Sequence, residues 1–272
     1  MNISAKERRL AEIKTEQAKL GNDLMIDRIQ ASRAKAAYQR QRRMNVVTIC
    51  NTEWLDTHTE RFIRLARRAM PDASYTLVHV GKPKDAAKSK TANKFDRVVS
   101  AVEKKATGYL HYNAIRYTLC ETLGMDEVVY IDPDVDIVAD ISHILEDCED
   151  DIGWCRSPVE PAGFGDAMLS LGLGNYPPWA NSGTLVIRGN FSDEYLAAAE
   201  KLVSIKFTPR MIGNAAFSVM LRQGGISHSE IPYKYGTIWW DNEHLPMAQC
   251  VHYCNDHGKA RRMALDAVWV DK

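Results

Sequence analysis

Apolar side chains follow two different periods along residues 44–272, and each period predicts one kind of element. Short apolar runs bounded by turn-forming residues predict buried strands. Segments with apolar side chains three and four positions apart predict helices with one buried face. The runs predict strands at Val46–Cys50, Tyr75–Val80, Glu127–Ile131, Ile152–Cys155 and Thr184–Ile187. The helical spacing predicts helices at Thr57–Met70, Thr107–Leu123, Ser192–Lys206 and Gly213–Arg222.

Residues that favour or break helices set the ends of these elements. Pro71 ends the first helix, Gly124 ends the second, and Ser192 is expected to cap the start of the third. Segments without a regular apolar period are expected to be loops. They are Lys82–Lys94, Pro158–Pro178 and the segment after Tyr253 that carries Lys259.

Strands and helices alternate in the first half of the chain. This order is typical of βαβ units, in which crossover helices join parallel strands. Ligands of open α/β sheets bind beyond the carboxyl ends of the strands. Asn51, Thr52 and Glu53 follow the first predicted strand, and the acidic run 132–136 follows the third. We therefore expect these two segments to face one crevice.

The first 43 residues differ from the rest of the chain, which divides it into a helical extension (1–43) and one domain (44–272). Their apolar residues fall at an imperfect heptad spacing, which predicts one or two helices that dock on the domain or pair with a second copy. Eleven Lys/Arg against five Asp/Glu give the extension a net charge of +6. Its basic part, 33–43, leaves an anionic partner open, although a solvated surface is the commoner use of such charge.

Composition narrows the class of protein. The net charge of the whole chain is zero, so nothing in it favours nucleic acid or an acidic membrane surface. The six cysteines are scattered without the paired spacing of a zinc finger, so free thiols in a reducing compartment are expected. No apolar stretch approaches the length needed to span a bilayer. We expect a cytoplasmic protein without a membrane anchor.

The run from Tyr130 to Asp136 carries the strongest chemical signal. Asp132 and Asp134 stand two positions apart after a buried strand, so their side chains point to the same side. Carboxylates so placed suit Mg²⁺ or Mn²⁺, which often share a site with substrate phosphates. The alternative is an acidic turn without a metal, because Asp also favours turns and helix starts. Asp136 and Asp140 fit that alternative, as solvated residues or as a cap of the next helix.

Four segments in the same order resemble motifs of the retaining glycosyltransferases of family 8 type. The family is known for Tyr-Leu-Asp-x-Asp, Asn-Ser/Ala-Gly, Pro-x-x-Tyr and closing His-Tyr/Phe…Gly…Lys segments. The matching segments here are Tyr130–Asp134, Asn181–Gly183, Pro232–Tyr235 and His252–Lys259. The resemblance covers roughly residues 45–263. It implies a GT-A (Rossmann-like) α/β fold, with a mixed, mostly parallel central sheet flanked by helices.

The resemblance also implies a reaction. A hexosyl- or pentosyltransferase of this type moves a sugar from a nucleotide sugar, usually a UDP-sugar, to a hydroxyl acceptor with retention of configuration. Mn²⁺ (or Mg²⁺) would bridge the diphosphate. The implied metal ligands are Asp132, Asp134 and His252. Residues implied to hold the donor are Asn51, Thr52, Glu53, Arg116 and Lys259, and Asn181 and Asn214 are implied to lie beside the donor sugar.

Four of these residues have a structural alternative. His252 would be a hydrogen-bonded core histidine, and Lys259 a solvated charge. Arg116 would be a surface helix residue paired with a carboxylate, and Asn181 a turn former.

The chain departs from the family where an acidic helix start is usual. Gly213–Ala216 takes that place, and Asn214 alone keeps an amide. A non-catalytic nucleotide-sugar-binding or interaction protein on the same fold is therefore the alternative function. A nucleotidyltransferase is disfavoured, because no Gly-rich basic loop follows the first strand. The acceptor is expected to be soluble, namely a protein, a glycan, a small molecule or DNA with a hydroxymethylated base.

Overall fold

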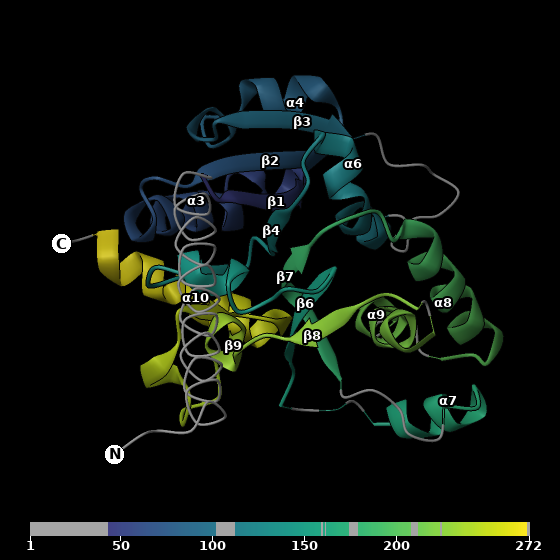
Figure 1. Ribbon diagram of the computed structural model, residues 1–272. Helices are drawn as coiled ribbons and strands as arrows, with labels where there is room; N and C mark the ends of the chain where they lie inside the picture. Colours follow the sequence, from purple (N-terminus) through teal and green to yellow (C-terminus); the bar gives the residue numbers. More distant parts are fainter. Residues whose placement is uncertain are drawn as a thin grey trace, which may run out of the picture. The chain divides into compact units, whose positions relative to one another are not determined.

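The central sheet of the protein has seven strands, in the order β3-β2-β1-β4-β7-β6-β8 (Figure 1). The computed structural model describes residues 43–101, 112–158, 160, 162–173, 179–207, 212–223 and 225–270. The sheet strands are β1 (Asn45–Asn51), β2 (Ser74–Val80), β3 (Arg97–Ala101), β4 (Val128–Ile131), β6 (Ile152–Arg156), β7 (Ala180–Ile187) and β8 (His228–Glu230). A second sheet, β5-β10-β9, contains β5 (Val135–Ile137), β9 (Thr237–Ile238) and β10 (Cys250–His252). The helices are α2 (Thr52–Leu55), α3 (His58–Ala69), α4 (Pro83–Lys88), α6 (Leu119–Leu123), α7 (Phe164–Ser170), α8 (Ser192–Ser204), α9 (Ile212–Gln223) and α10 (Asn255–Val270).

Most neighbouring strands of the large sheet are parallel, as predicted. β1 pairs in parallel with β2 and β4, β2 with β3, and β6 with β8. The exception is β7, which lies antiparallel between β4 and β6. Because β7 runs antiparallel to β4, the first residues of β7 lie beside the carboxyl end of β4 and Asp132. The Asp132 N–H donates to the Gly183 carbonyl at 2.8 Å.

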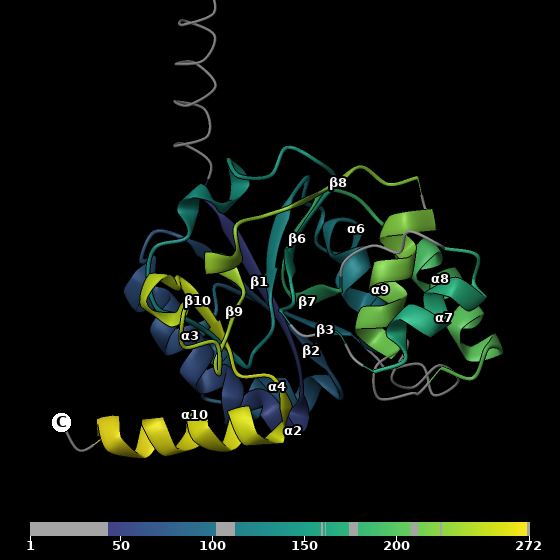
Figure 2. The same cartoon turned by 90° about the horizontal axis from the view of Figure 1, so that it is seen from below.

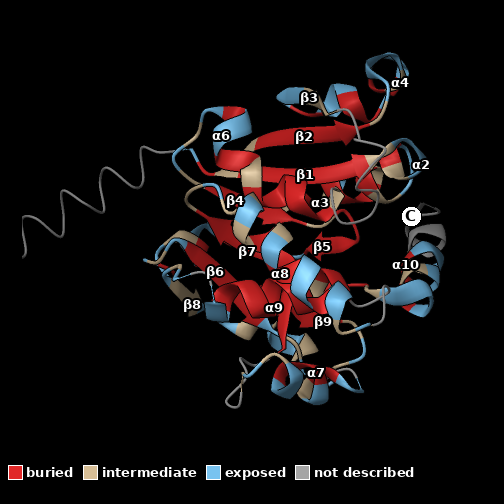
Figure 3. Cartoon of the chain, turned by 90° about the vertical axis from the view of Figure 1, so that its right-hand side faces the viewer, coloured by how far each residue is buried: buried red, intermediate tan, exposed pale blue. Residues whose placement is uncertain are grey.

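Successive residues of the strands belong to cores on opposite faces of the sheet, as the pleat requires. One core contains Val47, Tyr130 and Leu185, and the other contains Val46, Ile131 and Val186. The first core includes residues of α6, α8 and α9, and the second those of α3 and of the small sheet. Figures 1 and 2 show these groups on the two sides of the sheet, and Figure 3 shows the central strands as a deeply buried layer.

Two segments that were predicted to be loops contain helices. Lys82–Lys94 forms α4 and a 3₁₀ turn, because Pro83 opens the helix and its buried apolar residues are the small side chains of Ala86 and Ala92. The expected loop Pro158–Pro178 contains α7, part of which covers the first core.

The end of the chain also differs from the prediction. Lys259 lies on α10 rather than in a loop, because the Asn255 side chain accepts the Gly258 N–H at 2.9 Å and starts a helix there. Ser192 is the first helical residue of α8 and not its cap, and its N–H donates to the Asn190 side chain at 3.2 Å.

Several predictions concern residues outside the described ranges, namely residues 1–42, residues 107–111 of one expected helix, and residues 174–178 of one expected loop. The six cysteines are all free, as predicted, and five of them are buried. No helix in the described part of the chain combines the length and hydropathy required to cross a bilayer.

Candidate metal centre

The loop after β4 carries Asp132 and Asp134 and is held by backbone hydrogen bonds on both sides. The Val135 N–H donates to the Asp132 carbonyl at 3.0 Å, which closes a turn over Pro133. The Tyr253 N–H donates to the Asp134 carbonyl at 3.0 Å, which ties the loop to the chain just after β10. The positions of both carboxylates therefore depend on the backbone of two sheets.

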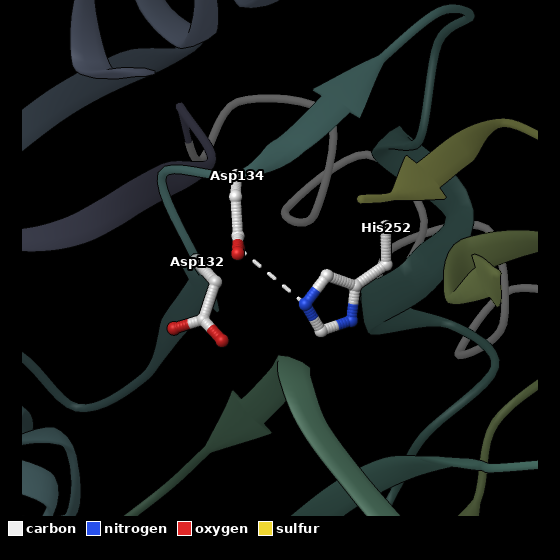
Figure 4. A group of neighbouring side chains, drawn as sticks. All are labelled: Asp132, Asp134 and His252. Atoms are coloured by element: carbon white, nitrogen blue, oxygen red, sulfur yellow. Dashed lines mark ion pairs between the residues drawn. The ribbon is translucent and has the colours of Figure 1, made fainter. Parts of the chain in front are cut away.

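His252 meets the two carboxylates because β10 pairs with β5. The pairing sets His252 opposite Val135, which places its ring beside Asp134. The ring Nε2 lies 3.4 Å from Asp134 Oδ1, and its Nδ1 lies 3.0 Å from the Asn181 amide nitrogen. One ligand atom from each of Asp132, Asp134 and His252 lies within 4.8 Å of the others (Figure 4).

Charge and burial act in opposite directions on this group. Burial disfavours the charged imidazolium of His252, but the neighbouring Asp134 carboxylate outweighs burial and raises the pKa of the ring above its ordinary value. Burial likewise opposes ionisation of Asp134, yet His252 and Lys259 hold the pKa of its carboxyl below the ordinary value. When the His252 ring is protonated, it forms a buried ion pair with the ionised carboxylate of Asp134.

The donor set fits one divalent cation. Two carboxylates and an imidazole are all metal ligands, and their distances allow one ion to contact all three. The Asn181 amide nitrogen lies 3.0 Å from the second ring nitrogen of His252, and this contact restricts the orientation of the ring. Asn181 is itself fixed, because its oxygen accepts the Gly183 N–H at 2.8 Å.

Lys259 approaches the same carboxylates from α10. Its ammonium lies 4.0 Å from Asp134 Oδ2 and 4.4 Å from the centre of the Trp54 ring. The side chain is about one quarter exposed, so the alternative of a fully solvated charge is wrong. Its contact with Trp54 also links α10 to the helix that follows β1.

Arg116 is buried and belongs to a polar chain that reaches Asp132. Its guanidinium donates to the Ser182 hydroxyl at 2.6 Å and to the Asn113 side chain at 3.1 Å, and lies 3.7 Å from Asp132 Oδ1. The Ser182 hydroxyl in turn donates to the Asn214 side chain at 2.6 Å. The alternative of a surface helix residue is therefore wrong for Arg116.

Asn51, Thr52 and Glu53 stand at the carboxyl end of β1, the strand beside β4. The Asn51 side chain accepts the Trp54 N–H at 3.0 Å and so caps α2. The Thr52 hydroxyl lies 3.1 Å from the buried His79 ring, and Glu53 is exposed. These three side chains do not belong to the group of Asp132, Asp134 and His252, although the neighbouring Trp54 contacts Lys259.

The two remaining acids of the run have structural partners. Asp136 is buried between Arg61 and Arg262, so the prediction that it is solvated is wrong. Asp140 accepts the Ser142 N–H at 2.8 Å beside the start of a short 3₁₀ helix, but Ile141 is the N-cap of that helix, so Asp140 is not the cap that one alternative predicted. Sequence reasoning missed Arg61, Arg262 and Trp54, which follow no local motif, and it assigned no role to Ser182, although Ser182 lies within the Asn181–Gly183 segment.

Comparisons with known proteins support the fold alone. No protein-family model matches the chain, and no curated protein matches it significantly in sequence. An active-site mutant of LgtC is similar in structure, with a TM-score of 0.52 and 13% identity over 78% of this chain and 88% of LgtC. The apo bifunctional glycosyltransferase WbbM has a TM-score of 0.55 and 12% identity over 79% of this chain and 46% of WbbM. The apo glycosyltransferase GlyE of Streptococcus pneumoniae TIGR4 has a TM-score of 0.50 and 16% identity over 79% of this chain and 55% of GlyE.

The matched region therefore spans most of LgtC but only about half of WbbM and GlyE. This chain combines a large mixed sheet with helices on both of its faces, and its likeness to the three proteins concerns that fold. The chain has a glycosyltransferase fold of the GT-A type.

Proposed function

We propose that the protein is a glycosyltransferase that moves a hexose or pentose from a UDP-sugar to a hydroxyl acceptor with retention of configuration. The convergence of Asp132, Asp134 and His252 within 4.8 Å at the carboxyl end of β4 carries this proposal. Ligands of α/β sheets bind at this end of the strands, and the fold is one that glycosyltransferases use. Asp132 and Asp134 serve as the metal-binding carboxylates and His252 as the third ligand.

Mn²⁺ is the proposed cation, with Mg²⁺ as the alternative. Carboxylates suit both ions, whereas an imidazole ligand favours the transition metal. When bound, the cation would neutralise charge on the diphosphate as the glycosidic bond breaks. Lys259 supports the same task, since its ammonium already lies beside Asp134 and can pair with a phosphate oxygen as a point charge.

The proposed reaction breaks the bond between the anomeric carbon and the diphosphate and forms a bond from that carbon to the acceptor oxygen on the same face. The acceptor's proton passes to the departing diphosphate. Asn181 and Asn214 offer amides rather than carboxylates beside the proposed sugar site, so a covalent enzyme intermediate is not proposed. Arg116 is proposed to hold the donor, and Asn51, Thr52 and Glu53 to hold its base and ribose.

A non-catalytic nucleotide-sugar-binding protein is the second candidate. The observation that favours it is the engagement of Asn214, whose side-chain oxygen accepts the Ser182 hydroxyl instead of being held free for a substrate. Such a protein would bind UDP-sugars with a metal and would release no UDP.

Release of UDP from a panel of UDP-sugars, with Mn²⁺, Mg²⁺ or a chelator, tests the proposal. Asp132→Asn and Asp134→Asn should each lower kcat/KM by roughly two orders of magnitude or more, because each removes a charged ligand. Asp140→Asn is the matched control, since it removes an exposed acid near the same run whose side chain accepts the Ser142 N–H. Wild-type turnover in the first two variants would refute the site. Binding of UDP without any release would favour the second candidate.

The acceptor is approached with the same assay. Proteins, glycans, small hydroxyl compounds and DNA with hydroxymethylated bases are added in turn to the wild-type protein and its preferred donor. An authentic acceptor raises UDP release above the rate of hydrolysis and gains the mass of one sugar.

A further inference from the structure

A buried cluster of one carboxylate and two guanidinium groups lies next to the candidate metal centre in the chain. Its members are Arg61, Asp136 and Arg262, here called the Asp136 cluster. Arg61 Nε donates to both oxygens of Asp136, at 3.0 and 2.8 Å. Arg262 contacts the same carboxylate through Nε and Nη2, both at 2.7 Å. Asp136 and Arg262 are each only 1% exposed.

The cluster joins three elements that are far apart in the sequence. Asp136 lies on β5, two residues after Asp134, Arg61 lies on α3, and Arg262 lies on α10. Burying three charged groups carries a large desolvation cost, which only good geometry offsets. Arg61 contacts both oxygens of the carboxylate and Arg262 contacts Oδ1 through two nitrogens, so the geometry meets that condition. α10 is thereby fastened to β5 at one defined point.

Arg262 also holds the metal-binding loop itself. Its Nη1 donates at 2.7 Å to the carbonyl of Pro133, the residue between Asp132 and Asp134. One planar guanidinium therefore contacts the Asp136 carboxylate and the loop backbone at once. A lysine ammonium at the end of a flexible stem has no comparable fork.

Lys259 lies three residues before Arg262, so both side chains project from the same face of α10. With Arg262 fixed against β5 and the loop, Lys259 has its ammonium 4.0 Å from Asp134 Oδ2. Arg262 and Lys259 are thus about one helical turn apart on α10.

We propose that Arg262 is a positioning residue, which locks α10 to the metal-binding loop through the Asp136 cluster and so presents Lys259 to the diphosphate of the donor. This inference rests on the proposed function, because it assigns the phosphate-binding role to Lys259. Arg262 itself touches no substrate in this scheme and acts through Lys259.

A double-mutant cycle on binding of UDP in the presence of Mn²⁺ tests the inference by calorimetry on the full chain. Lys259→Met should weaken UDP binding about 10- to 100-fold, the range for a lost charge-assisted hydrogen bond. Arg262→Met should weaken it about 10-fold or more, while Asp136 keeps Arg61 as a partner. The double variant should bind no more weakly than Lys259→Met alone, within about twofold, because the two residues act on one contact. If Arg262 had only a structural role, the losses of UDP-binding free energy in the two single variants would add in the double variant. Additive losses overturn the inference.

Two further variants separate geometry from charge. Arg262→Lys keeps the positive charge but not the fork, so it should lose UDP affinity as Arg262→Met does. Full affinity in Arg262→Lys overturns the inference. Arg261→Met removes a charge from the exposed neighbouring position, whose guanidinium lies over Trp239 instead, and should bind UDP as the wild type does. A loss in Arg261→Met equal to that in Arg262→Met also overturns it.

Folding is monitored by thermal unfolding of each variant. If Arg262→Met does not fold, the cycle is run with Arg262→Lys, which keeps the charge and most of the stem. Absence of UDP binding in the wild type with Mn²⁺ overturns the proposed function itself. Normal UDP binding with a loss in Lys259→Met and none in the Arg262 variants overturns only this inference.

Discussion

Gly183 on β7 is the position where the smallest addition should disable the metal centre. A Cβ at Gly183 would lie 2.5 Å from His252 Cε1 and 2.6 Å from its Nδ1. The ring cannot turn away freely, because it is buried and held by Asp134 on one side and Asn181 on the other. Gly183→Ala must therefore displace a proposed metal ligand or the strand that carries it.

The size of the displacement follows from the contact. Moving from 2.5 Å to the 3.4 Å of ordinary contact requires about 0.9 Å. Metal–ligand distances tolerate only about 0.2 Å of error, so His252 should no longer complete the site. We expect the affinity for Mn²⁺ to fall about 10- to 100-fold, as when a supporting residue of a metal ligand is lost. Overpacking should also lower the free energy of unfolding by about 1–3 kcal/mol.

Gly153→Ala on β6 provides a matched control for that instability. Its added Cβ would lie 2.6 Å from Cys148 Sγ, which is a similar clash at a buried position of a neighbouring strand, away from His252. Mn²⁺ affinity by calorimetry and the free energy of unfolding by urea titration are measured on both variants. Gly183→Ala should lower both the Mn²⁺ affinity and the free energy of unfolding, whereas Gly153→Ala should lower only the free energy of unfolding. Wild-type Mn²⁺ affinity in a folded Gly183→Ala protein would refute the assignment of His252 as a ligand.

Three other predictions test the surroundings of the site. The pKa of His252 is raised in the metal-free protein, and a cation binds only the neutral ring, so Mn²⁺ affinity should rise with pH through that pKa and level off above it. Asp134→Asn should lower the pKa of His252, and NMR titration of the ring measures this change. Gly124→Ala should cost about 1 kcal/mol of stability in urea and leave Mn²⁺ affinity unchanged, because Gly124 has a φ of 65° in open space. Ser182→Ala should cost roughly 1.5–3 kcal/mol in the same assay, because the buried Arg116 loses its 2.6 Å hydrogen bond.

The central strands could be predicted from the sequence because they are buried on both faces. β1 and β2 are mostly apolar runs, and the pattern predicted their positions to within a residue. β3 was not predicted, since it is an edge strand whose first two residues are exposed, and this leaves little apolar signal. β7 was predicted too short, because Asn181 and Ser182 at its start are polar although they are buried. Polar residues in a buried strand hide it from a hydrophobic pattern, and they occur where the strand serves the site.

The candidate site was predictable to the extent that it is local. The spacing of Asp132 and Asp134 suggested a shared ligand, and only the family resemblance pointed to His252. The partners of Asp136 lie 75 and 126 residues away, so no local pattern could identify Arg61 or Arg262. Contacts of that kind follow from how α3 and α10 pack on β5, which periodicity does not determine.

The pairing register of β7 against β4 positions two residues that contact the partners of Asp134 and Asp132. Asn181 contacts His252, the partner of Asp134, whereas Ser182 contacts Arg116, the partner of Asp132. These neighbouring strand residues serve opposite sides of the sheet, since adjacent side chains alternate in direction. A slip of one residue in the pairing of Ile131 with Thr184 would move each of them to the wrong side. The antiparallel strand is therefore the element that fixes both carboxylates relative to their partners, and substitutions at its first residues should affect metal affinity more than equally destabilising ones elsewhere in the sheet.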